Sequence, residues 1–95
     1  RLPGRGVVKA NGVRVRARID VMPKPGIADP QGQTVERTLP ALGWANVSGV
    51  RVGKHLELEL EGESVEALRE QVEEMCRRFL ANPVIESYVY SLEPA

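Results

Sequence analysis

The sequence predicts an α+β domain of ferredoxin-like topology, β-α-β-β-α-β, with a four-stranded antiparallel sheet and both helices on one face. Two patterns lead to this prediction. Apolar and charged residues alternate at 13–22 and 55–61, which is typical of strands with one buried face. Apolar residues at helical spacing form a stripe over 65–80. With 95 residues the chain is short, and we expect one domain at 13–95.

The first helix is indicated by the residues at its two ends. Asp29 offers a carboxylate for the N-cap, and Pro30 suits the first helical position because its missing N–H is not needed there. Pro40 would clash with the helix backbone, so we expect the helix to bend or stop within 39–42, with Gly43 beyond it.

A second and a third strand are expected next, joined by a hairpin. Val47, Val50 and Val52 indicate a strand with an irregular centre. Gly53-Lys54 suits a two-residue hairpin with glycine at the first turn position, leading into strand 55–61.

The second helix should begin after Ser64, whose side chain suits the N-cap. Asn82 suits the left-handed residue past its end, and Pro83 prevents continuation. A last strand is expected at 84–92. The apolar stripe of the helix comprises Val65, Leu68, Val72, Met75, Cys76, Phe79 and Leu80.

Charge patterning indicates how the strands pair. In the predicted topology the first and third strands lie side by side, which places three arginines beside three glutamates on the face away from the helices. These residues are Arg14, Arg16 and Arg18 with Glu57, Glu59 and Glu61.

The composition restricts the possible functions. Thirteen basic and thirteen acidic residues balance, so no net field draws the protein to nucleic acid or to an acidic membrane surface. The sequence has no apolar run long enough for a membrane span. A lone cysteine fits the reducing cytoplasm. Residues 1–12 are expected to be an N-terminal extension, disordered or derived from the expression vector.

No catalytic constellation is evident. His55 is the only histidine, which excludes a two-histidine metal site or a His-based triad within one chain, and we expect it at the surface. Cys76 lies on the apolar stripe and is expected to be a small buried hydrophobe. The glutamates of strand 55–61 are expected to be paired with arginine. No catalytic residue is therefore assigned, and no metal.

Two features leave alternatives open. Gly53-Lys54, following Arg51, is either a plain turn with a solvated lysine or a polar contact for a partner protein or a phosphorylated ligand. Tyr88 and Tyr90 are expected at the edge of the core or in a subunit interface, since the sheet lacks the aromatic, positive platform that RNA recognition needs.

Three segments resemble the PurS family, the small subunit of phosphoribosylformylglycinamidine synthase (formylglycinamide ribonucleotide amidotransferase), over about 13–92. The segments are Asp29-Pro30-Gln31-Gly32, Arg51-Val52-Gly53-Lys54 and Leu80-Ala81-Asn82-Pro83-Val84-Ile85-Glu86.

The resemblance implies a non-catalytic subunit of a carbon–nitrogen ligase complex of purine biosynthesis. The complex converts formylglycinamide ribonucleotide to formylglycinamidine ribonucleotide with glutamine, ATP and magnesium. The small subunit would bind no cofactor alone. It would form a homodimer or tetramer, bridge the glutaminase subunit and the large synthetase subunit, and assist ammonia transfer. The alternatives are a regulatory module that binds a small molecule, a small enzyme, and an RNA-binding domain.

We therefore expect the candidate site to be a partner or subunit interface. Its predicted residues are Asp29, Pro30, Gln31, Gly32, Arg51, Gly53, Lys54, Asn82, Tyr88 and Tyr90.

Overall fold

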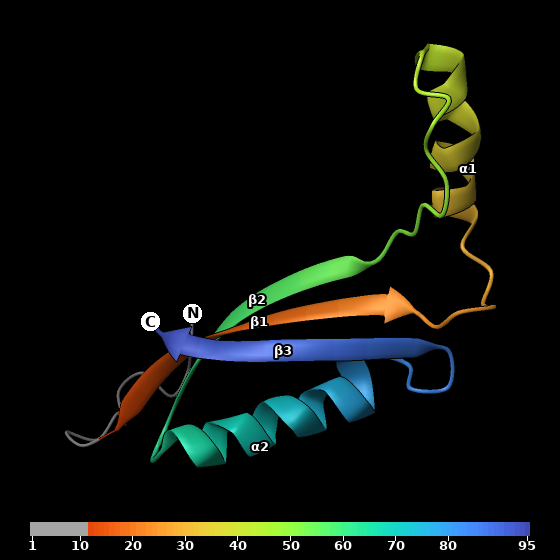
Figure 1. Ribbon diagram of the computed structural model, residues 1–95. Helices are drawn as coiled ribbons and strands as arrows, with labels where there is room; N and C mark the ends of the chain where they lie inside the picture. The colour runs from red at the N-terminus through yellow and green to blue at the C-terminus, as the bar shows by residue number, and fades with distance from the viewer. Residues whose placement is uncertain (1–11) are drawn as a thin grey trace.

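In the computed structural model, which describes residues 12–95, a three-stranded antiparallel sheet has one helix beneath it (Figure 1). The strand order is β2-β1-β3, with β1 (Val13–Pro23) in the centre and β2 (Lys54–Gly62) and β3 (Glu86–Pro94) at the edges. The sheet therefore has three strands where the sequence predicted four, and that fold prediction is wrong. The predicted extension falls largely on residues 1–11, which lie outside the described part.

The segment expected to form the second strand does not join the sheet, because other groups take its backbone donors. The N–H of Val50 donates to the Glu36 carboxylate at 3.1 Å, and the N–H of Val52 donates to the Asp29 carboxylate at 2.8 Å. Gly49 adopts a left-handed φ of 71°, which is incompatible with a regular strand. The segment instead returns alongside the first helix (Figure 1).

The first helix, α1 (Pro30–Thr38), also departs from the prediction, because it stands away from the sheet. Its ends are as expected: Asp29 is the N-cap, and the α-helix stops at Thr38. A 3-10 turn containing Pro40, η2 (Leu39–Leu42), follows and leads to left-handed Gly43. The prediction that both helices cover one face of the sheet is nevertheless wrong. We call residues 27–52 the arm; the molecule measures 57 × 28 × 21 Å along its principal axes.

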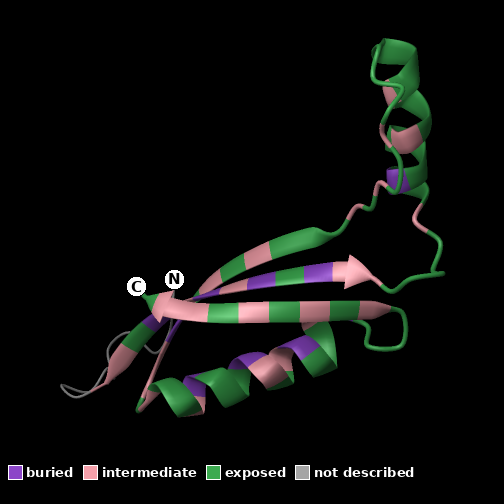
Figure 2. Cartoon of the chain, in the orientation of Figure 1, coloured by how far each residue is buried: buried purple, intermediate pink, exposed green. Residues whose placement is uncertain are grey.

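The core lies between β1 and the second helix, α2 (Val65–Met75), which continues as a π-helical turn, η3 (Cys76–Leu80). Ser64 caps α2 by accepting a hydrogen bond from the Ala67 N–H at 3.1 Å, as predicted. Figure 2 shows the buried residues concentrated on β1 and on the upper side of α2. The buried hydrophobic residues are Val15, Ala17, Ile19, Val21, Leu60, Leu68, Val72, Cys76 and Ala81.

The other face of the sheet carries the predicted ladder of opposite charges. The register places Arg14 opposite Glu61, Arg16 opposite Glu59 and Arg18 opposite Glu57, so the predicted pairing is confirmed. Glu93 of β3 adds a carboxylate 3.0 Å from Arg18. The positive charges of the arginines on this face are thus balanced by glutamates of the neighbouring strands. Over the described residues, the face presents no row of aromatic side chains of the kind that stacks RNA bases.

His55 closes one end of this ladder, bound through both ring nitrogens. Its Nδ1 lies 2.6 Å from the Asp20 carboxylate and its Nε2 2.9 Å from that of Glu57. Only the imidazolium can donate to both. The hydrogen bonds to Asp20 and then to Glu57 raise the pKa of His55 above its ordinary value.

We expect this pair of contacts to make stability depend on pH. Because the pKa of His55 is raised on folding, its stabilisation is fully present below the unfolded pKa of about 6.5 and is lost as pH rises through the higher folded pKa. NMR titration of the imidazole should give a pKa above that of an unfolded peptide, and Asp20→Asn should lower it. A wild-type value at or below the peptide value would contradict the assignment.

Candidate interaction site

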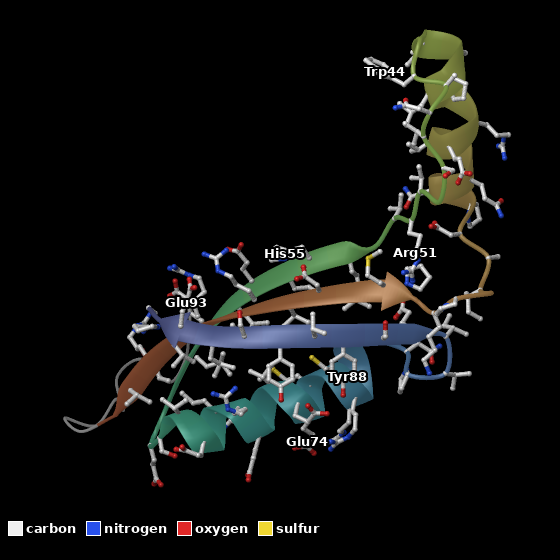
Figure 3. All side chains as sticks on the ribbon, viewed as in Figure 1. Trp44, Arg51, His55, Glu74, Tyr88 and Glu93 are labelled. Carbon is white, nitrogen blue, oxygen red and sulfur yellow. The ribbon has the colours of Figure 1, made fainter. Side chains whose placement is uncertain are left out.

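The predicted site residues do not converge on one site in this structure. Asp29–Gly32 and Arg51 lie at the base of the arm (Figure 3). Lys54 and Asn82 line a hollow beside η3. Tyr88 and Tyr90 lie on the side of β3 that faces the helix. The residues therefore fall into three separate groups.

At the base of the arm, the Asp29 carboxylate joins two segments. One oxygen accepts the N–H of Gly32 at 3.1 Å, and the other accepts the N–H of Val52 at 2.8 Å. The first bond caps α1, while the second fixes the returning segment to the helix start. The role visible here is therefore to hold the arm together.

Gly32 is required at this point because the returning backbone comes close. A Cβ on Gly32 would lie 2.8 Å from the carbonyl oxygen of Val50 and closer still to the Asp29 carboxylate. Pro30 occupies the first turn, as predicted. The motif Asp-Pro-Gln-Gly therefore describes a capped helix start against which a second segment packs.

Removing the Asp29 carboxylate should loosen the arm. We expect Asp29→Ala to lower the free energy of unfolding by about 1–2 kcal/mol, because both N–H groups lose their acceptor. Asp29→Asn, which keeps one acceptor oxygen, should lose less. Urea denaturation measures both, and an Asp29→Ala protein as stable as wild type would contradict this role.

Gly53 does not form the predicted hairpin. It follows an irregular segment and directly precedes β2, and it is not among the glycines of residues 12–95 that have positive φ, which are Gly26, Gly43 and Gly49. A Cβ at Gly53 would instead collide with the Val21 carbonyl oxygen and the Met22 sulfur. Glycine is required here for close approach of the chain to β1, and the turn prediction is wrong.

Tyr88 and Tyr90 share one carboxylate on α2. Their hydroxyls donate to the two oxygens of Glu73 at 2.6 and 2.8 Å, and their rings stack with centroids 6.5 Å apart. The hydrogen bond to Glu73 raises the pKa of Tyr88 to about 12, and the same contact lowers the pKa of Glu73. The half-buried tyrosines thus attach β3 to α2.

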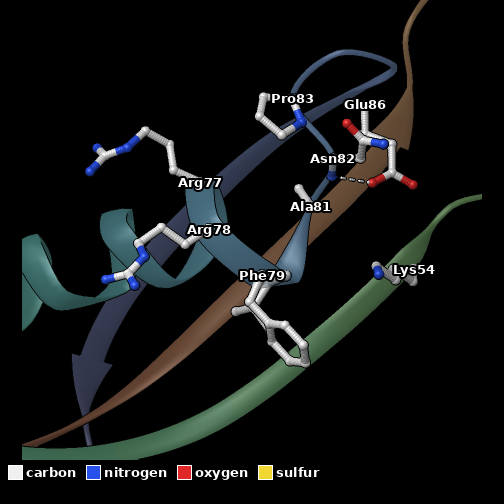
Figure 4. Close-up of a pocket in the computed structure, with 9 residues that line it drawn as sticks. Lys54, Arg77, Arg78, Phe79, Ala81, Asn82, Pro83 and Glu86 are labelled. Carbon is white, nitrogen blue, oxygen red and sulfur yellow. Dashed lines mark hydrogen bonds between the residues drawn. The ribbon is translucent and has the colours of Figure 1, made fainter.

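The third place is a shallow hollow of about 400 Å³ between the start of β2 and η3 with the loop that follows it (Figure 4). Its lining combines basic, apolar and amide side chains. Asn82 does not adopt the predicted left-handed conformation, since no non-glycine residue described has positive φ. Its side-chain oxygen accepts the Val84 N–H at 3.1 Å instead. The lining residues are Lys54, Arg77, Arg78, Phe79, Leu80, Ala81, Asn82, Pro83 and Glu86.

Phe79 is the residue of this hollow that the sequence pattern misplaced. It was expected on the buried stripe of the helix, but its exposed fraction is 84 %. The cause is the change from α to π winding at Cys76, because a wider turn shifts the following residues around the helix axis. Cys76 itself is buried as predicted, and burial raises the pKa of its thiol.

Within residues 12–95, no cluster of three or more His, Cys, Asp or Glu side chains could hold a metal ion, and no helix there could span a membrane. What the described residues present is a sheet with a compensated charged face, a projecting arm with exposed apolar side chains and a basic hollow beside an exposed phenylalanine. These features define a small protein built for association.

Comparison with known proteins identifies the family. The PurS model, described as phosphoribosylformylglycinamidine (FGAM) synthase, matches residues 16–94. The PurS subunit of this synthase from Methanocaldococcus jannaschii is 41% identical over 78 residues, covering 82% of this chain and 94% of that protein. The Bacillus subtilis PurS subunit is 40% identical over 78 residues, covering 82% and 92%. The chain belongs to the PurS family.

Solved structures agree with this assignment. The PurS subunit from Thermotoga maritima matches with a TM-score of 0.77 and 35% identity, covering 84% of this chain and 92% of that one. A chain in the structure of PurLQS from the same organism matches with the same score and identity, covering 84% and 98%. The resemblance seen in the sequence is therefore confirmed.

Proposed function

We propose that this chain bridges the glutaminase and synthetase subunits of phosphoribosylformylglycinamidine synthase and assists the passage of ammonia between them. One observation carries the proposal: the fold matches a chain of the PurLQS structure over nearly all of that chain's length. As a PurS protein, this chain is a non-catalytic subunit of that ligase in purine biosynthesis. Bridging, ammonia transfer and a cytoplasmic location are the further steps that we propose.

The chemistry explains why such a subunit would be needed. Ammonia released from glutamine is protonated in water near neutral pH and then cannot act as a nucleophile. It also diffuses away unless the two active sites are held in a closed assembly. We assign ATP and magnesium to the synthetase subunit, which leaves this chain the task of holding the assembly together.

We further propose that the chain acts as a homodimer or tetramer, with the arm as the main contact. Within the arm, α1 and η2 make few contacts with the sheet, and several large apolar side chains of the arm are exposed. Leu42 is 64 % exposed and Trp44 55 %. Trp44 lies near the tip of the arm (Figure 3), and Leu42 ends η2 two residues before it. Exposed apolar side chains of this kind are stabilised when a second surface covers them.

The proposed function is tested by comparing two nitrogen sources in the reconstituted complex. Omitting this chain should strongly reduce formylglycinamidine ribonucleotide synthesis from glutamine, while synthesis from added ammonium salt should fall much less, because free ammonia bypasses the bridge. Adding the chain back should restore glutamine-dependent synthesis. Equal loss with both nitrogen sources, or no loss with either, would contradict the proposal.

A further inference from the structure

We propose that the corner formed by Lys54, Arg77, Arg78, Phe79, Pro83 and Val84, called here the Phe79 corner, binds an acidic segment of another subunit that carries an apolar side chain. The inference rests on the proposed function, because it gives the bridging subunit a specific contact surface. It places that contact on η3, on the loop that follows and at the start of β2, rather than on the arm.

The apolar part of the corner is unusually exposed. Phe79 is 84 % exposed and Val84 79 %, the two highest values among the large hydrophobic residues described. Figure 4 shows the Phe79 ring projecting from the helix end. Phe79 also borders a second hollow with Gln71, Glu74 and Met75, so it stands on a ridge between two depressions. An aromatic ring with flanking arginines is the usual composition of an interface hot spot.

The basic part surrounds the ridge. Arg78 is 74 % exposed and Arg77 54 %, and Lys54 lies across the hollow in Figure 4. Lys24 approaches the same loop, donating to the Pro83 carbonyl oxygen at 2.6 Å. Among residues 12–95, neither lysine has a carboxylate within salt-bridge distance.

The nearby carboxylates are already engaged within the chain. Glu73 accepts both tyrosine hydroxyls and lies 3.8 Å from Arg77. Glu74 pairs with Arg78 at 2.9 Å, and Glu86 accepts the Asn82 N–H at 2.7 Å. The two arginines keep more than half of their side-chain surface exposed beside these contacts, and the two lysines have no carboxylate partner among residues 12–95, which favours an acidic partner.

Two other occupants fit less well. A two-fold contact with a second copy would set the corner against itself, bringing Arg77, Arg78 and Lys54 near their own counterparts. A mononucleotide could use the cations, but Phe79 stands on the rim of the hollow, so one base would leave most of the ridge in water. A polypeptide segment crossing the ridge can cover both depressions.

The test measures binding of this chain to the purified synthetase and glutaminase subunits by calorimetry. Phe79→Ser and Arg78→Glu should each weaken binding about tenfold or more, as expected for hot-spot residues. Binding of wild type should weaken as salt rises, and Arg78→Glu should reduce that dependence. Val89→Ser, at a strand position 66 % exposed, and Arg69→Glu, a charge reversal earlier in α2, are matched controls and should bind like wild type.

Melting curves and sedimentation establish that each variant is folded. Unchanged binding by Phe79→Ser and Arg78→Glu would overturn the inference while leaving the proposed function intact. So would a change of oligomeric state in Phe79→Ser, which would assign the corner to a second copy. Binding of ATP or ADP to wild type that Arg78→Glu abolishes would identify a nucleotide site instead. A wild-type chain that binds neither subunit would contradict the proposed function itself.

Discussion

Replacing Gly53 with valine is expected to lower the free energy of unfolding by about 3 kcal/mol or more. The new Cβ would meet the Val21 carbonyl oxygen and the Met22 sulfur, and valine adds two further methyl groups. Val21 is only 1 % exposed and lies in the central strand, so the carbonyl can move only by distorting the core. Urea denaturation of wild type and variant measures the loss.

Two comparison variants separate crowding from backbone conformation. Gly53→Ala already introduces the Cβ and should show a large part of the loss. Gly26→Ala tests positive φ alone, since φ is 85° there and no atom lies within 4 Å of the new Cβ; it should cost about 1 kcal/mol. If Gly53→Ala were no more costly than Gly26→Ala, close approach to β1 would not be the reason for glycine at this position.

Changing the tip of the arm should dissociate the homo-oligomer. We expect Leu42→Asp combined with Trp44→Ser to weaken self-association about a hundredfold or more, because two apolar side chains proposed to lie in the interface become polar. Both side chains are largely exposed in the single chain, so its fold should survive. Sedimentation equilibrium measures the dissociation constant, with circular dichroism reporting the fold.

The control for the arm variant is Val89→Ser, which removes an exposed apolar side chain from the sheet. It should associate like wild type if the arm is the contact. An arm variant that associates as tightly as wild type would contradict this role, and so would equal weakening by Val89→Ser.

Elements with a periodic pattern and a clear cap were predictable from the sequence. The alternation in β1, the Ser64 cap and the break at Pro40 each depend on local chemistry, and each appears as expected. The pairing of β1 with β2 could also be anticipated, because the arginines of one strand needed the glutamates of the other.

The missing strand and the exposed Phe79 could not be predicted in the same way. In each case the local sequence pattern is overridden by a feature that the pattern does not contain. The valines at 47–52 had a strand pattern, but Asp29 and Glu36 take the N–H groups of Val52 and Val50. Phe79 was in phase with the buried stripe until η3 changed the helical period. A π turn has no clear signature in one sequence.

The assignment of the candidate residues to an interface stays a prediction. The contacts found for two of them are internal: the Asp29 carboxylate joins two segments of the arm, and Gly53 allows close approach of the chain to β1. What the sequence could not reveal is that residues 47–52 return alongside α1, where the carboxylates of Glu36 and Asp29 accept the N–H groups of Val50 and Val52.

The central position of β1 has a consequence for how the chain folds. β1 precedes both of its neighbours in the sequence, and Ile19 pairs with Leu56 on one side and with Tyr90 on the other. Such long-range contacts are slow to form, because a large loop must close before any contact is gained. During synthesis, β1 and β2 can meet as a two-stranded ribbon well before β3 has been made. Until β3 arrives, the other edge of β1, apolar on one face, stays open to pairing with other chains.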